Sequence, residues 1–269
     1  MRTSPAAAGM GMRAALHAEW TKLRTVSSTL WLLLATIALT AAVGLISVAG
    51  VRCPYEGCAA DPAKISLAGI DLGQAVVAVL AVFVITGEYG TGMIRASLAA
   101  MPRRGTLLAA KALVTTAVVL IAGTIAVLGS VLAGRLILSG KGFTPGHGYL
   151  PLSLADGPVL RAAAGSVLYL ALIALLSHGI ATAVRDSAAA IGVVLGLLYL
   201  FPIMAAVVTD PDWSRRLQQV GPMTAGLAIQ ATTGLHHLPI APWAGLGVLT
   251  AWATAALLAG ALLLRLRDA

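Results

Sequence analysis

Residues 66–86 read SLAGIDLGQAVVAVLAVFVIT, and residues 87–111 directly after them read GEYGTGMIRASLAAMPRRGTLLAAK. The first stretch is apolar along most of its length. It is long enough for an α-helix, rising about 1.5 Å per residue, to cross about 30 Å of hydrocarbon. The second stretch combines a turn-prone start, a short apolar segment and a basic end. Together they predict a membrane-spanning helix followed by an organised surface loop.

Further apolar stretches of similar length occur on both sides of this pair. A soluble chain is usually about a quarter charged, whereas 10% of these 269 residues are charged and 59% are apolar, with a mean hydropathy of +0.92. We therefore predict an all-α membrane protein made of a single domain, residues 1–269. Its six spans are expected at about 29–49, 66–86, 112–138, 162–184, 188–208 and 243–264.

The formal net charge of +8 is distributed between the apolar stretches and does not form the basic stripe with interleaved aromatics typical of a nucleic-acid-binding protein. No nucleic-acid partner is expected. If the N-terminus is inside, the inner side has eleven basic and four acidic residues, and the outer side has seven and six. The positive-inside rule then predicts a multi-pass protein of the cell membrane with both termini in the cytoplasm.

Residues 1–28 form a basic leader before the first span. Leu16, Trp20 and Leu23 recur at helical spacing, while most of the cations fall elsewhere around the helix. This pattern predicts an amphipathic helix that lies along the inner face of the membrane and contacts lipid. The alternative is a solvated basic segment that only sets the orientation of the chain.

The loop between the second and third spans is expected to hold a short cytoplasmic helix at about 92–101. Such a helix would offer a partner both apolar and basic side chains. Alternatively, Arg103, Arg104 and Lys111 are only positive anchors on the inner side.

The leader HAEWTKLRT, followed at once by a span, and the loop GEYGTGMIRASLAAMPRRGTLLAAK resemble the permease subunits of ABC-2 type ABC transporters. In that family the loop has the pattern GEY-x-x-G-x-I-R-x-x-L-x-x-x-P-R-R-x-x-x-x-x-A-K. The residues of this chain that match the pattern are Gly87, Glu88, Tyr89, Gly92, Ile94, Arg95, Leu98, Pro102, Arg103, Arg104, Ala110 and Lys111.

The resemblance implies a half-transporter in which two permease chains, identical or different, form the pathway for export of a hydrophobic or amphiphilic substrate. A separate ATP-binding subunit would dock on the loop and would bind ATP and Mg²⁺, so no cofactor and no enzymatic activity are expected in this chain. The residues agree with this expectation. A phosphate-binding loop needs G-x-x-x-x-G-K-[ST], and the nearest sequence, GSVLAGRL at 129–136, lacks the Lys and the Ser or Thr.

Polar residues near the outer side allow two interpretations each. Asp71 either lines the transport pathway, because charges within spans are often functional, or lies among the outer head groups.

Cys53 and Cys58, the only cysteines, are expected to form a disulfide in an oxidising compartment. A metal site is the weaker alternative, because no His or Cys completes a known ligand spacing. The outer loops, 50–65, 139–161 and 209–242, are rich in Pro and Gly, which predicts irregular structure.

Ala188, Gly192 and Gly196 place small side chains along one face of the fifth predicted span, with a G-x-x-x-G step that favours close helix packing. This face would contact either another helix of the same chain or a second permease chain.

Two other functional classes compete with the permease. A membrane-embedded enzyme would need paired acids, a metal cluster or a nucleophile with a base, and the spans offer Asp71 and His178 without an obvious partner. An autonomous secondary transporter would be expected to carry interrupted helices at matching places in its two halves, and none is apparent.

Overall fold

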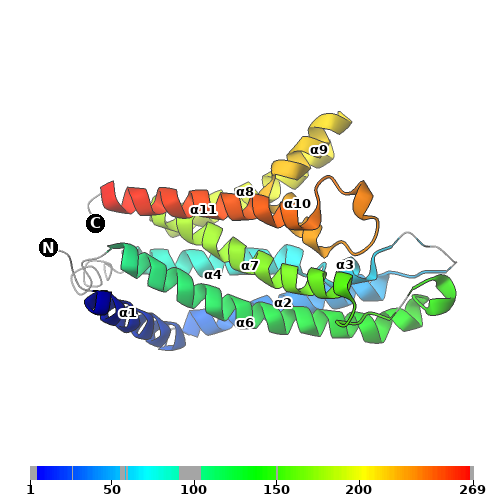
Figure 1. The fold of residues 1–269 in the computed structure, drawn as a ribbon, viewed down its shortest axis with the longest axis horizontal. Helices are drawn as coiled ribbons and strands as arrows, with labels where there is room; N and C mark the ends of the chain where they lie inside the picture. The colour runs from blue at the N-terminus through cyan, green and yellow to red at the C-terminus, as the bar shows by residue number, and fades with distance from the viewer. Residues whose placement is uncertain are drawn as a thin grey trace.

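The structure is a computed structural model that describes residues 5–25, 27–54, 58, 60–90, 104–149 and 151–266. The described residues form helices and connecting turns, with no strand among them. In Figure 1 the long helices lie side by side, and both chain termini are at one end of the bundle, here called the terminal end. The opposite end is called the far end. The longer helices are α1 (Pro5–Thr25), α2 (Ser27–Gly50), α4 (Ile70–Gly90), α6 (Arg104–Leu138), α7 (Gly157–Val184), α8 (Ser187–Val207) and α11 (Pro242–Leu266).

Six of these helices, all except α1, are long and apolar enough to cross a membrane. The prediction of an all-α protein with six spans is therefore confirmed. The helix α6 has 35 residues, or about 50 Å at 1.5 Å per residue. It begins well before the predicted span at 112, so that Lys111 is inside the helix and not in a loop. The expected short helix at 92–101 lies outside the described residues.

The second span starts later than predicted, because the chain bends between residues 66 and 70. Ser66 ends a short separate helix, α3 (Pro62–Ser66), and α4 begins at Ile70. At the bend the backbone passes so close to α2 that a Cβ on Gly69 would lie 1.8 Å from the carbonyl oxygen of Thr40. Only glycine fits there, and the bend places Asp71 in the first turn of α4.

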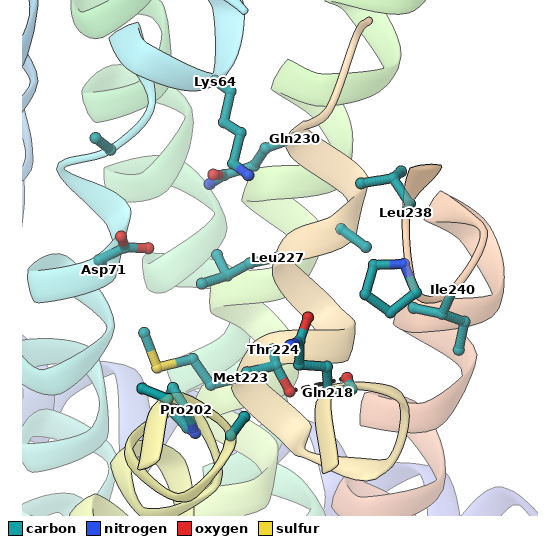
Figure 2. A pocket seen from close by; sticks show the side chains of 15 residues that line it. Lys64, Asp71, Pro202, Gln218, Met223, Thr224, Leu227, Gln230, Leu238 and Ile240 are labelled. Atoms are coloured by element: carbon teal, nitrogen blue, oxygen red, sulfur yellow. Dashed lines mark hydrogen bonds between the residues drawn. The ribbon is translucent and has the colours of Figure 1, made fainter. Parts of the chain in front are cut away.

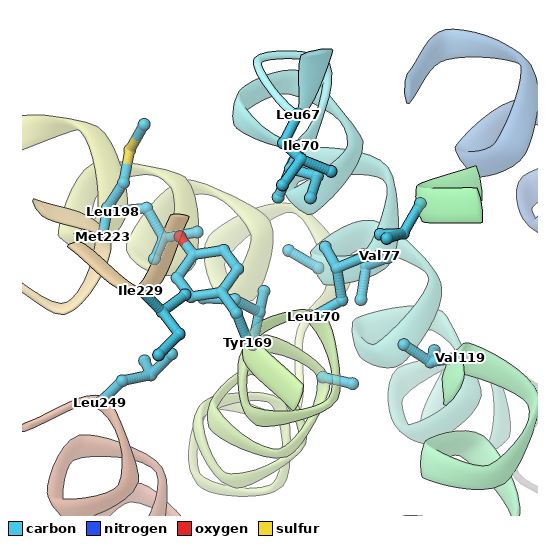
Figure 3. Packing of buried hydrophobic residues seen from close by; sticks show 14 of the residues in the cluster. Leu67, Ile70, Val77, Val119, Tyr169, Leu170, Leu198, Met223, Ile229 and Leu249 are labelled. Atoms are coloured by element: carbon cyan, nitrogen blue, oxygen red, sulfur yellow. The ribbon is translucent and has the colours of Figure 1, made fainter. Parts of the chain in front are cut away.

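The helix α7 is the centre of the bundle and packs against α4, α6, α8 and α11. Tyr169 and Leu170, near its middle, are fully buried. Figure 3 shows that they contribute to one cluster in which Leu198, Ile229 and Leu249 lie near the Tyr169 ring and Val77 lies near Leu170.

Close backbone contact between α7 and α11 depends on glycine. A Cβ on Gly179 would lie 2.3 Å from the carbonyl carbon of Ala256, and one on Gly260 would lie 2.6 Å from the carbonyl oxygen of Gly179. Because lipid is as apolar as the side chains, helices in a membrane associate through such close packing rather than through the hydrophobic effect. The outer helices α2, α8 and α11 correspondingly expose large apolar residues, such as Trp31, Val207 and Leu258.

The far end is more ordered than the Pro- and Gly-rich sequence predicted, and the prediction of irregular structure for 209–242 is wrong. This segment forms α9 (Pro211–Val220), α10 (Pro222–Leu227) and two short 3₁₀ helices, η3 (Ala228–Gln230) and η4 (Leu235–His237). Asp210 caps α9 by accepting hydrogen bonds from the backbone N–H groups of Asp212 and Trp213, at 2.9 and 3.1 Å. Proline at the first position starts both α9 and α10, where its missing N–H costs nothing.

The other two far-end connections contain short helices as well. Residues 139–149 include η1 (Ser139–Lys141) and η2 (Pro145–His147). The backbone N–H of Cys53 donates to the carbonyl oxygen of Lys141 at 2.9 Å, which joins these two connections. Asp61 caps α3 and also accepts a hydrogen bond from the hydroxyl of Thr232 at 2.6 Å. The far end is therefore a layer of short helices held together by polar contacts.

Candidate functional site

Four charged side chains meet at the terminal end of the bundle, and we call them the ionic cluster: Glu19, Lys22, Glu88 and Lys111. The ammonium of Lys111 lies 2.8 Å from a Glu19 carboxylate oxygen and 2.7 Å from Oε1 of Glu88. The ammonium of Lys22 lies 2.7 Å from the same Glu88 oxygen and 3.2 Å from the other Glu19 oxygen. Each cation therefore contacts both carboxylates.

The cluster is buried on one side and open on the other. The side chains of Lys111 and Glu19 are 4% and 3% exposed, and that of Glu88 is 10% exposed, whereas that of Lys22 is 33% exposed. Isolated charges are costly to bury, and pairing with hydrogen bonds offsets much of that cost. Two positive and two negative charges make the cluster neutral overall, which allows it to lie inside the bundle.

Three helices supply the cluster, and their order in the chain explains its position. Glu88 lies near the end of α4, and Lys111 lies in the second turn of α6, so these two residues lie on either side of residues 91–103. Glu19 and Lys22 come from α1, which packs against α6 and α2. Ala15 and Glu19, four residues apart, form the buried face of α1.

The residues exposed on α1 are of the kinds expected in a helix that lies along a membrane surface. Trp20 is 42% exposed, while Arg13 and His17 are also exposed. The leader is helical over Pro5–Thr25, and α1 is not solvated on all sides, because its buried face contacts the spans. Whether Trp20 contacts lipid remains a prediction.

The pKa of Lys22 follows from these contacts. Partial burial lowers it, but the hydrogen bond and charge of Glu88 and the charge of Glu19 together outweigh burial, and the pKa of Lys22 is raised above its ordinary value of 10.5. The cation is therefore held in its charged form by its two partners.

The end of α4 is held from a second side by the turn between α7 and α8. The guanidinium of Arg185 lies over the ring of Tyr89, 5.5 Å from its centroid. Arg185 caps α7 in the left-handed conformation, with φ 65°. In the following turn the hydroxyl of Ser187 donates to that of Thr86 at 2.8 Å. Glu88 thus connects this end of α4 to α1 and α6, and Tyr89 connects it to the turn between α7 and α8.

The predicted loop residues are only partly described. Gly87 is exposed and a Cβ there would meet nothing within 4 Å, Glu88 belongs to the ionic cluster, and Tyr89 contacts Arg185. Arg104 is the first residue of α6. The other predicted residues lie outside the described part of the chain: Gly92, Ile94, Arg95, Leu98, Pro102 and Arg103.

Sequence reasoning missed the central role of Glu19 and underestimated Lys111, which it treated as part of a motif or as a positive anchor. The signal for Glu19 was an acidic residue in an otherwise basic amphipathic helix, three positions before a lysine. No pattern along the chain could pair it with Lys111, since the two are 92 positions apart.

The cluster does not resemble a catalytic site. Both carboxylates are neutralised by ammonium groups, and within the described ranges no three His, Cys, Asp or Glu side chains gather closely enough to hold a metal ion. His178 is fully buried in α7. The arrangement is suited to holding three helix ends together rather than to proton transfer or hydrolysis.

Other predicted sites lie elsewhere in the fold. Cys53 and Cys58 form a disulfide at the far end. Ala188, Gly192 and Gly196 are exposed on the outside of α8, and a Cβ on either glycine would meet nothing within 4 Å. The face therefore does not pack against the described residues of the same chain. Asp71 lines a cavity at the far end.

No protein-family model matches this chain, and a search of curated proteins finds no match.

Proposed function

We propose that this chain is the permease subunit of an ABC-2 type ABC transporter, located in the cell membrane with its terminal end in the cytoplasm. Two such chains would form the translocation pathway, and a separate ATP-binding subunit, with ATP and Mg²⁺, would dock on the predicted cytoplasmic loop, about 87–111, and drive export. The resemblance of the leader and of the loop to that family motivates the proposal, and six apolar helices are compatible with it.

The observation that carries the proposal is that both resembling segments contribute to one ionic cluster. Glu19 comes from the leader, whereas Glu88 and Lys111 come from the two ends of the loop segment. A force on the loop would be applied to the ends of α4 and α6, which Lys111 joins to each other and to α1. A partner that moves the loop would therefore displace these helices together, as coupling between two subunits requires.

An autonomous secondary transporter would not need this arrangement, because no external subunit would act on the loop. A purely structural membrane anchor would not need it either. Both alternatives therefore predict that no ATP-binding subunit associates with the chain, whereas the permease proposal predicts that one does. A binding experiment separates them.

The test is copurification of the tagged chain from membranes with an ATP-binding subunit, detected by mass spectrometry of the purified sample. Wild type is expected to retain the partner, and Glu88→Ala and Arg95→Ala are expected to lose it while still being inserted in the membrane. Arg135→Ala, at the far end of α6, is the matched control and is expected to behave as wild type. Absence of an ATPase from the wild-type sample would contradict the proposal and favour an autonomous transporter.

A further inference from the structure

A cavity of about 440 Å³ lies at the far end, opposite to the ionic cluster. It is lined by Lys64 of α3, the start of α4, the last turns of α8, and residues between Gln218 and Ile240 (Figure 2). Its volume is in the range of about 300–1,000 Å³ that is usual for small-molecule sites. The residues around it separate into an acidic side, a side with hydrogen-bond donors and an apolar wall.

The acidic side is Asp71. Figure 2 shows its carboxylate directed into the cavity toward Leu227. Among the described residues no side chain or backbone N–H forms a hydrogen bond or an ion pair with this carboxylate. The backbone carbonyl of Asp71, in contrast, accepts hydrogen bonds from Gln74 at 3.0 Å and from Tyr199 at 2.6 Å. These bonds fix the first turn of α4 and leave the carboxylate available for a cationic ligand.

The donor side is formed by Gln230 and Lys64. Gln230 is only 2% exposed, and its Nε2 group has no hydrogen-bond partner in the described part of the chain. A buried amide without a partner is unfavourable, and a ligand acceptor would remove that cost. Lys64 also lines the cavity, and in the view of Figure 2 its side chain is directed toward Gln230. The cavity therefore has two donors, one of them charged.

The rest of the cavity is largely apolar. Pro202, Met223, Leu227, Leu238 and Ile240 line it, and the first three belong to α8 and α10. An aliphatic chain would contact this wall, and the polar groups would remain for a head group. The cavity is thus matched to a molecule that is amphiphilic.

The two charged residues define the head group further. Lys64 disfavours a ligand that is only cationic, and Asp71 disfavours one that is only anionic. We propose that the cavity binds a zwitterionic amphiphile, with its ammonium group at Asp71, its anionic group at Lys64 and Gln230, and its apolar chain along the wall. A phospholipid with a phosphoethanolamine head group has this chemistry. The inference that this amphiphile is the transported substrate rests on the proposed function. The inference that the cavity binds it does not.

The test is calorimetric titration of the purified chain in detergent, without any ATP-binding subunit, with three short-chain probes. Dihexanoyl phosphatidylethanolamine carries both charges, dihexanoyl phosphatidic acid lacks the ammonium group, and hexylammonium lacks the anion. Wild type is expected to bind the first probe at least about 10-fold more tightly than the others, as one additional charge-assisted contact provides.

Asp71→Asn is expected to weaken binding of the phosphatidylethanolamine probe about 10-fold and to abolish its advantage over phosphatidic acid. Lys64→Gln, at an exposed position where folding is not at risk, is expected to weaken both phosphate-containing probes and to leave hexylammonium unaffected or stronger. Asp156→Asn is the matched control, since Asp156 is also a far-end carboxylate but is exposed and makes no capping hydrogen bond.

Equal affinity for the three probes, absence of binding, or unchanged binding by Asp71→Asn would overturn the inference. The copurification experiment remains independent of these results. If the chain binds an ATP-binding subunit but no lipid probe, the proposed permease function stands and the proposed lipid site is rejected. If it binds the lipid probe but no ATP-binding subunit, the lipid site stands and the permease function is rejected.

Discussion

Lys111 in α6 and Glu19 in α1 are joined by a 2.8 Å contact between ammonium and carboxylate, although 92 positions separate them in the sequence. Both side chains are almost fully buried. The pair connects the leader helix α1 to the beginning of the span α6. Lys111 also contacts Glu88, which lies at the end of the span α4. Three helix ends are thereby joined through a single lysine.

Removal of this lysine is expected to be strongly destabilising. Lys111→Met would preserve the length of the side chain and leave two buried carboxylates with only Lys22 as partner, at an expected cost of about 3–5 kcal/mol. Thermal unfolding of the detergent-purified protein measures the effect. Arg135→Met, on the exposed side of the same helix, serves as control and should change stability by less than about 0.5 kcal/mol. Equal melting of both variants would show that the ionic cluster does not stabilise the fold.

Lys22 contacts the same two carboxylates but is partly exposed, and Lys22→Met is expected to cost less than about 1 kcal/mol. Because its folded-state pKa is raised above 10.5, its contribution is fully present below pH 10.5 and is lost as the pH rises through the raised pKa. Unfolding measured between pH 8 and pH 11.5 should therefore show a stability difference between wild type and Lys22→Met that is constant at first and then shrinks. A difference that grew with pH would contradict this assignment.

The disulfide between Cys53 and Cys58 closes a short loop, and its removal by Cys53→Ser with Cys58→Ser is expected to cost about 2 kcal/mol. In intact cells a membrane-impermeant maleimide should label the wild-type chain only after treatment with a reductant. Labelling that required permeabilised membranes would place the far end in the cytoplasm and reverse the predicted orientation.

Gly192 and Gly196 lie on a face of α8 that no described residue of the chain contacts, so Gly192→Leu with Gly196→Leu should leave the melting temperature of the isolated chain nearly unchanged. If this face contacts a second permease chain, the same variant should give less crosslinked dimer in detergent. Gly179→Leu is the contrasting variant, because its side chain would collide with the backbone of α11 and should lower stability directly. Unchanged dimer yield in the α8 variant would exclude this face as the interface between chains.

The positions of the spans were predictable because each depends only on a local property, namely about 20 consecutive apolar residues. The errors arose where the chain bends or where short helices form. Ser66 is separated from α4 by a bend that depends on contact between Gly69 and α2, and α9 depends on capping by Asp210. The cap of α9 is local in sequence, but Asp and Pro are common in loops as well and do not by themselves predict a helix. The bend at Gly69 is a tertiary feature, because it depends on contact with another helix.

The sequence alone determined that the chain is an all-α protein with six helices able to span a membrane, since hydropathy and helix length are properties of each segment. Tertiary structure alone decided which charges meet. Glu19, Glu88 and Lys111 are brought together by the packing of α1, α4 and α6, and Asp71 in α4 and Gln230 in η3 are brought to one cavity because both elements pack against α7. Burying a charge is unfavourable unless a partner is supplied, and which partner is near depends on how whole helices pack rather than on any spacing along the chain.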